Sequence, residues 1–183
     1  ENYEPLEIKY EDLEESDLWI RNKFNICLES YEKALKSYHF YEMASLIYEF
    51  VWGDFCDWYI ELTKPRIYKK SSERSYRVAI DNLVIILKSI LNLLHPMMPF
   101  ITEEINSIFS NKPLVEENWV KPFALQNANP GAKIELLIEM IVNIRTVRSN
   151  LNIPPDKKTK IFIESSENLV ATIIDQEKNS ILQ

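Results

Sequence analysis

Apolar residues recur at helical spacing along most of the chain. The first stripe begins after Ser16 or Asp17, either of which is a suitable N-cap, and comprises Ile20, Phe24, Cys27, Leu28, Tyr31 and Leu35. Similar stripes cover residues 40–63, 80–94 and 99–109. Residues three or four positions apart share one face of a helix, so each stripe predicts an amphipathic helix. Four such helices with short connections predict an antiparallel bundle.

Prolines set the expected helix ends. Pro65 should end the second helix, because proline lacks the N–H of the helical ladder, and the third should end at His95 and Pro96. Pro99 suits the first turn of the fourth helix. The residues of that helix expected to face the core are Ile101, Ile105, Ile108 and Phe109.

The chain changes character after the bundle. Residues 111–129 are irregular, and a fifth helix should run from Asn129 and Pro130 to just before Pro154 and Pro155. Residues 159–164 alternate as in a short strand, and residues 169–174 suggest another helix. The predicted fold is therefore mainly α: an antiparallel helix bundle followed by a small α/β appendage. We divide it into an acidic lead-in at 1–16, the bundle at 17–112, and a connecting helix with a small, truncated α/β subdomain at 113–183.

Composition fits one or two folded units. The 183 residues are 46% hydrophobic and 27% charged, with two glycines, which is typical of a helical globular protein. No apolar run approaches the roughly 20 residues of a membrane span, and the acidic N-terminus lacks a signal peptide's features. We expect a soluble, cytoplasmic protein without a membrane partner.

Charge is distributed unevenly. The net charge is −7, but residues 1–17 hold eight of the 28 acids and one of the 21 bases, so the remainder is neutral. Residues 64–77 hold six bases and one acid, and a second basic cluster spans residues 145–160. Basic patches on a neutral body suit a modest RNA contact, although solvated helix faces also produce such runs.

The candidate phosphate contacts are the bases of the first cluster and the two arginines of the second. They are Lys64, Arg66, Lys69, Lys70, Arg74 and Arg77, followed by Arg145 and Arg148. Aromatic side chains could stack on unpaired bases, but those of this sequence lie on apolar stripes and are expected to be core residues instead. They are Trp52, Trp58, Tyr59 and Phe100.

Catalytic and metal sites are not expected. Cys27 and Cys56 lie far apart within apolar helical patterns, and neither histidine has ligand spacing to them, so we predict no metal. His39 and His95 have no evident nucleophile or base partner. The carboxylates of Asp54, Asp57 and Glu61 share one helix face, where solvation is the ordinary explanation.

Three motifs resemble one family. Residues 48–66, YEFVWGDFCDWYIELTKPR, resemble the Tyr-Glu-Phe-x-Trp-x-x-Phe-Cys-Asp-Trp-Tyr-Ile-Glu run that leads into Lys-Pro-Arg in valyl-tRNA synthetases. Residues 94–105 are similar to the Leu-His-Pro-x-x-Pro-Phe-x-Thr-Glu-Glu element that the valine, isoleucine and leucine enzymes share. Residues 144–158 resemble the valine enzyme's Ile-Arg-x-x-Arg-x-x-x-Asn-x-Pro-Pro-x-Lys-Lys segment. Residues 58–61 favour the valine enzyme over the isoleucine enzyme, which usually has Tyr-Leu-Asp there.

The resemblance implies a class I synthetase anticodon-binding domain. The His-Ile-Gly-His and Lys-Met-Ser-Lys-Ser motifs of this class are absent from the sequence, so the chain is expected to be a non-catalytic segment of a valine–tRNA ligase. It would position tRNA(Val) by its anticodon arm for aminoacylation in a catalytic domain elsewhere. It would hold no cofactor itself, since ATP and Mg²⁺ would bind that catalytic domain. Its expected partners are the tRNA and the catalytic and editing domains of the same polypeptide.

Two other classes remain open from the residues alone. One is a helical protein-interaction scaffold. The other is a small helical enzyme, which the missing site disfavours. Within the synthetase class, the same region of an isoleucyl- or leucyl-tRNA synthetase is also an alternative. RNA binding would be distinguished by a steep log-linear fall in affinity with salt.

Overall fold

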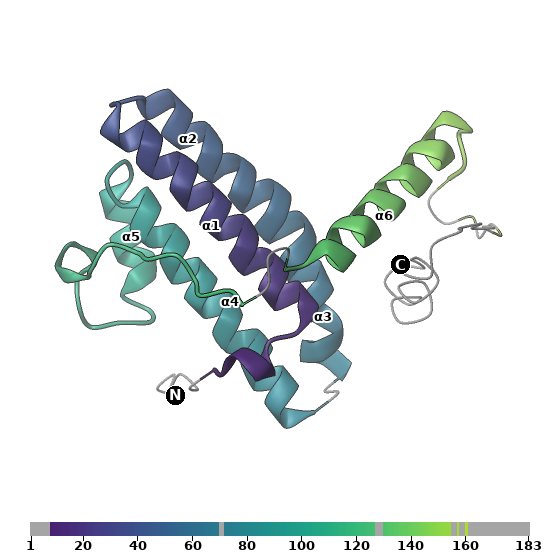
Figure 1. The fold of residues 1–183 in the computed structure, drawn as a ribbon, viewed down its shortest axis with the longest axis horizontal. Helices are drawn as coiled ribbons and strands as arrows, with labels where there is room; N and C mark the ends of the chain where they lie inside the picture. The colour runs from purple at the N-terminus through teal and green to yellow at the C-terminus, as the bar shows by residue number, and fades with distance from the viewer. Residues whose placement is uncertain (1–7, 70–71, 127–129, 155–156, 158–159, 161–183) are drawn as a thin grey trace. The chain divides into compact units, whose positions relative to one another are not determined.

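The computed structural model describes residues 8–69, 72–126, 130–154, 157 and 160. The chain divides into two compact units, Glu1–Pro130 and Gly131–Gln183, and each is described by itself (Figure 1). The first unit includes the segment between residue 112 and Pro130. The described residues of this unit are predominantly helical, as predicted.

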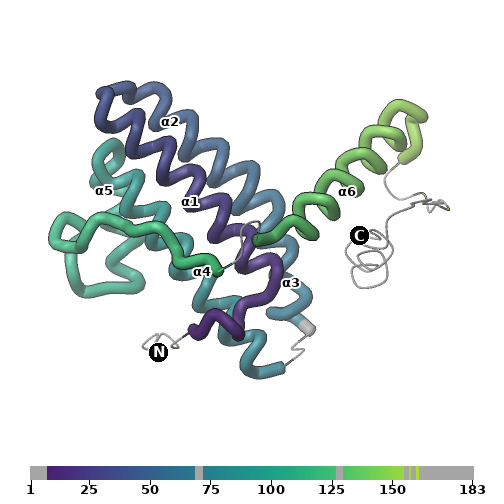
Figure 2. The backbone as a smooth tube through the Cα atoms, viewed as in Figure 1, coloured from purple at the N-terminus to yellow at the C-terminus, as the bar shows by residue number. Residues whose placement is uncertain are grey.

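The first unit is built from three long helical rods. Two hydrogen bonds, Arg21 Nε to Asn82 Oδ1 at 2.7 Å and Tyr31 Oη to the Leu93 carbonyl at 2.6 Å, show that the first and third rods run in the same direction. The middle rod in the sequence runs in the opposite direction beside the first, since Cys27 contacts Leu46 and Asp17 contacts Tyr59 (Figure 2). The rods are α1 (Glu15–Lys36), then α2 (Phe40–Glu49), η2 (Phe50–Tyr59) and α3 (Ile60–Lys69) in unbroken succession, then α4 (Glu73–Leu94).

The core lies where the three rods meet. Large aromatic side chains supply much of it, and Phe24 and Phe50 make an edge contact with ring centroids 5.6 Å apart. Burying apolar area of this kind is the main stabilising term of folding. The largest fully buried side chains of this unit are Trp19, Tyr31, Tyr59, Phe24, Ile20, Met43, Ile47, Ile86, Leu93 and Val78.

The middle rod departs from the prediction at Pro65. The expected helix end is wrong, because Pro65 lies inside α3 and the helix continues to Lys69. Before it, η2 is a π-helix, in which the Ile60 N–H bonds to the carbonyl five residues back, Phe55. Wider π turns bring residues five apart onto one face. Phe50 and Phe55 are accordingly both buried.

Two helix termini also differ from expectation. α1 begins at Glu15, with Glu14 as its N-cap, and Asp17 accepts the Glu14 N–H at 3.0 Å in a capping box. The fourth predicted helix is α5 (Pro99–Asn106), which has proline in its first turn as predicted but ends before the expected residue 109.

The apolar face predicted for α5 is partly wrong. Ile101 and Ile108 are exposed, whereas Thr102 and Asn106 are buried. Asn106 Nδ2 donates to the Lys112 carbonyl at 2.9 Å, so polar groups tie α5 to the chain that follows it.

An extended segment, residues 117–126, which we call the strap, lies along α1 and α4. Asn25 exchanges two hydrogen bonds with the backbone of Phe123, donating to its carbonyl at 2.9 Å and accepting its N–H at 2.7 Å. Asn92 donates to the Asn118 carbonyl at 3.3 Å and accepts the Val120 N–H at 3.1 Å. Each side-chain amide thus supplies the donor and the acceptor that a neighbouring strand would offer to an extended backbone.

Aromatic contacts add to the binding of the strap. The Phe123 ring meets Phe24 edge-on at 5.4 Å, and the Arg21 guanidinium lies 5.1 Å from the centre of the same ring. Trp119 Nε1 donates to Glu32 at 3.0 Å. The strap is therefore held both by its backbone and by its ring side chains. It follows η3 (Leu114–Glu116), and the short η1 (Tyr10–Asp12) precedes α1.

In the second unit, α6 (Ala132–Asn150) confirms the predicted fifth helix. The strand expected at 159–164, apart from residue 160, and the helix expected at 169–174 lie outside the described residues. Among the residues that are described, no helix is long and apolar enough to cross a membrane.

Replacing Asn25 by leucine should lower the free energy of unfolding by about 1–3 kcal/mol, because the Phe123 N–H and carbonyl lose their partners. Urea unfolding measures the change. Asn22→Leu is the matched control, since Asn22 lies on the same helix and its side chain has no hydrogen bond within the described part of the chain. Equal losses in the two variants would show that Asn25 does not hold the strap.

Candidate nucleic-acid interface

The described bases among residues 64–77 lie at one end of the first unit, where α3 ends and α4 begins. Lys64 and Arg66 lie on α3, Lys69 is its last residue, and Arg74 and Arg77 lie on the first two turns of α4. Lys70 lies outside the described residues. The described part of the predicted basic connection is therefore mostly helical, and we call the end of α3 and the start of α4 the basic end.

Arg66 is the exception among these bases, because it is buried. Its guanidinium Nη1 lies 2.9 and 2.8 Å from the two carboxylate oxygens of Asp17. The side chains of Arg66 and Asp17 are 7% and 0% exposed, so the two charges form a buried ion pair. Arg66 thus serves the interior of the bundle, and it drops out of the set of candidate phosphate contacts.

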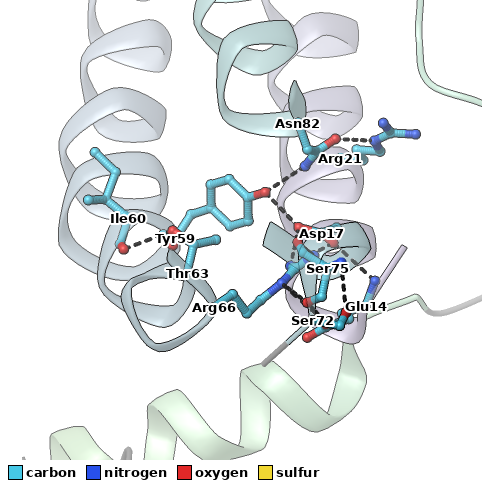
Figure 3. A network of polar contacts seen from close by, with 10 residues as sticks. All are labelled: Glu14, Asp17, Arg21, Tyr59, Ile60, Thr63, Arg66, Ser72, Ser75 and Asn82. Carbon is cyan, nitrogen blue, oxygen red and sulfur yellow. Dashed lines mark hydrogen bonds and ion pairs between the residues drawn. The ribbon is translucent and has the colours of Figure 1, made fainter. Parts of the chain in front are cut away.

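Arg66 also fixes the start of α4. Its Nε donates to Ser75 Oγ at 3.1 Å and its Nη2 to the Ser75 carbonyl at 3.1 Å. Ser75 Oγ in turn donates to Glu14 at 2.7 Å, and the Ser72 side chain caps the helix by accepting the Ser75 N–H. One arginine therefore joins the first turn of α1, the end of α3 and the beginning of α4 (Figure 3).

The network continues inward through Tyr59. Its hydroxyl donates to Asp17 at 2.6 Å and accepts from Asn82 Nδ2 at 2.7 Å. Asn82 Oδ1 accepts from Arg21 (Figure 3). Buried polar groups are tolerated when their hydrogen bonds are satisfied, and this chain of contacts satisfies them. We call Asp17, Tyr59, Arg66 and Asn82 the polar hub.

Burial shifts the pKa of two side chains in this network, Tyr59 and Arg21. Burial raises the pKa of Tyr59 well above its ordinary value of 10.0, and the nearby Asp17 carboxylate raises it further. Burial lowers the pKa of Arg21, against the attraction of Asp17. The folded state therefore requires Tyr59 to be a neutral hydrogen-bond donor.

Three other bases of this end are more accessible than Arg66. Arg77 and Arg74 are exposed, and Lys64 is half-buried and paired with Glu61. Arg74 binds Asp12 with two hydrogen bonds, Nε to Oδ1 at 2.6 Å and Nη2 to Oδ2 at 2.5 Å. The acidic lead-in therefore meets the basic end of the bundle.

The second basic cluster belongs to the other unit. Arg145 and Arg148 lie on α6, and Arg148 donates to the carbonyls of Pro154 at 2.8 Å and Lys157 at 3.0 Å. These two hydrogen bonds connect the backbone after α6 to the last turn of the helix. Arg145 is exposed on the same helix.

Two of the aromatics expected in the core are at the surface instead. Trp52 is 55% exposed and Phe100 is 91% exposed, whereas Tyr59 is fully buried and Trp58 is half-buried. Trp52 contacts Tyr48, itself 63% exposed, with ring centroids 6.3 Å apart. Helical periodicity did not separate these surface rings from the core rings.

The two histidines and Asp54 have ordinary polar partners. His95 shares a 2.8 Å hydrogen bond with Thr102, and His39 lies 3.3 Å from Glu42. Asp54 pairs with Lys23 at 3.8 Å. Within the described ranges, no group of three or more His, Cys, Asp or Glu residues could hold a metal ion.

The bundle and its basic end agree with a family match. The chain belongs to the family described as the anticodon-binding domain of tRNA ligase, which matches residues 17–163. Its relatives are valine–tRNA ligases, so the predicted resemblance is confirmed. Those of Carboxydothermus hydrogenoformans and Aquifex aeolicus are 35% and 36% identical over 96% and 93% of the chain. That of Thermosynechococcus vestitus is 38% identical over 85%. The chain spans only 16–20% of the length of these curated relatives.

Replacing Arg66 by methionine should lower the free energy of unfolding by about 3–5 kcal/mol, because the buried Asp17 carboxylate loses its counter-charge. Adding Asp17→Asn should recover part of that loss, and urea unfolding of the single and double variants tests both statements. Arg74→Met, which removes an exposed arginine from the same end, should cost much less. Similar losses for the two arginines would contradict the hub.

Alkaline conditions should destabilise the chain through Tyr59. Its folded pKa lies above its unfolded pKa, so the stability it contributes is present below about pH 10 and is lost as the pH rises above that value. Urea unfolding from about pH 9 to about pH 11 should show a shallower decline for Tyr59→Phe than for the wild type. An unchanged decline would show that Tyr59 is not buried as a neutral phenol.

Proposed function

We propose that this chain is the anticodon-arm-binding segment of an ATP-dependent valine–tRNA ligase. It holds tRNA(Val) so that the acceptor end reaches a catalytic domain elsewhere in the polypeptide. The observation that carries the proposal is the basic end of the bundle, in a chain of the anticodon-binding family. ATP and Mg²⁺ act in the catalytic domain and need no site here.

The geometry suits a contact with an RNA backbone. Phosphate contacts need cationic side chains at the surface and a rigid base that keeps their spacing. Arg74 and Arg77 are exposed on α4, and Lys64 is half-buried on α3. Arg66 and Ser75 lock these two helices together. Lys69 and Lys70 add two positive charges to the same stretch of the sequence. Arg145 and Arg148 are further candidates on α6.

A second candidate function is protein interaction, favoured by one face of the middle rod. Residues 40–63 contain five acids and no lysine or arginine. Tyr41, Tyr48 and Trp52, which are 87%, 63% and 55% exposed, lie on this stretch. An acidic and aromatic face repels phosphate and suits a basic protein surface. This face would serve the scaffold alternative, or contact other parts of the same polypeptide.

Reversing the charge of Lys64 and Arg77 to glutamate should weaken binding of a tRNA(Val) transcript. It should also reduce the slope of log affinity against log salt by about one for each lost phosphate contact. Filter binding or fluorescence anisotropy over a salt series measures both quantities.

The matched control reverses Lys33 and Lys36. These bases lie in the last turn of α1, at the opposite end of the rod from Asp17, and the change in net charge is the same. If both double variants bind equally, long-range charge alone explains the effect and the basic end is not the interface. If the wild type binds no tRNA at any salt concentration while its exposed aromatic face binds protein, the scaffold function is favoured instead.

A further inference from the structure

The basic end holds two arginine–aspartate pairs that differ in access to water. Arg66 and Asp17 are enclosed, with side chains 7% and 0% exposed. In the second pair, the Arg74 side chain is 58% exposed and that of Asp12 is 12% exposed. Both arginines contact both oxygens of their carboxylates. Only the second arginine can be reached by a ligand from solvent.

Asp12 is held in place independently of Arg74. It ends the short η1 turn, and its Oδ2 accepts the Lys9 N–H at 3.0 Å. The next residue, Leu13, packs in a small apolar cluster with Leu18 of α1 and Val78 of α4. The lead-in is therefore docked on the start of α4, and it delivers the carboxylate to a fixed position.

We propose that Asp12 occupies the phosphate-binding edge of Arg74 and thereby sets the affinity of the basic end for RNA. The proposal rests on the proposed function above. A carboxylate bound through two parallel N–H groups uses the same guanidinium edge that binds a phosphate. RNA must displace Asp12 before Arg74 can contact its backbone.

The exchange is feasible because the arginine of the pair is exposed. Exposed ion pairs contribute little to stability, so a phosphate can replace the carboxylate at small cost. The Lys9 N–H still donates to the Asp12 carboxylate after the exchange, so Asp12 keeps one hydrogen bond. Arg66 cannot exchange in this way, because its departure would leave Asp17 charged and buried. The fold thus separates a structural arginine from an exchangeable one.

Binding of a tRNA(Val) transcript to the whole chain tests the proposal with the variants Asp12→Asn, Arg74→Gln and their combination. Asp12→Asn should raise affinity by about two- to fivefold and steepen the salt slope by about one, as Arg74 becomes available. Arg74→Gln should weaken binding slightly. In the double variant, the gain from Asp12→Asn should disappear, because no guanidinium is left to be released.

Glu11→Gln is the matched control, since it removes an exposed negative charge from the neighbouring position of η1. It should raise affinity less than Asp12→Asn, and equally in the presence and absence of Arg74. Asp12→Ala provides a second variant in which no hydrogen bond to Arg74 survives, and urea unfolding verifies that each variant is folded.

The outcomes separate this inference from the proposed function. A gain that persists in the Arg74→Gln background, or no gain in either Asp12 variant, would overturn the role of Asp12. Salt-dependent binding that Lys64→Glu with Arg77→Glu abolishes would at the same time leave the proposed function intact. Absence of any salt-dependent tRNA binding by the wild type would overturn both.

Discussion

The buried contact between Asp17 and Arg66 is the constraint on which the rest of the bundle depends. Two opposite charges taken out of water need a full set of hydrogen bonds, and their partners must come from whatever lies nearby. Here they come from Tyr59, Ser75 and Glu14, on three different rods or their termini. Satisfying one carboxylate and one guanidinium therefore fixes where α1 begins, how far α3 extends and where α4 starts.

This requirement explains why Pro65 does not end its helix. Proline removes one backbone hydrogen bond and disfavours a helix interior by about 3 kcal/mol. Helix ends taken from sequence assume that nothing downstream offsets that cost. Arg66 follows immediately, and it reaches Asp17 only if the helical path continues past the proline. A tertiary contact thus overrides a local signal.

The sequence predicted the helices well and the uses of their charged residues poorly. Periodicity located the rods because a helix face needs apolar residues every three or four positions, and the family motifs identified the domain. Arg66 could not be distinguished from its basic neighbours, since a buried pair depends on a residue 49 positions away. The strap is extended and its sequence lacks periodicity, so no pattern of apolar residues predicted it. Trp52 and Phe100 satisfy a helical stripe and nevertheless face solvent.

The strap has a consequence for how this domain can vary or be altered. Asn25 and Asn92 hold peptide groups, which every residue carries, and so they specify the path of the strap without specifying most of its side chains. Lys121 and Pro122, exposed between the two clamped points, are free to diverge in sequence. The number of residues between the clamps is not free, because an insertion would shift one clamp out of register. Two side-chain amides on two helices thus fix the length of a segment that has no regular secondary structure of its own.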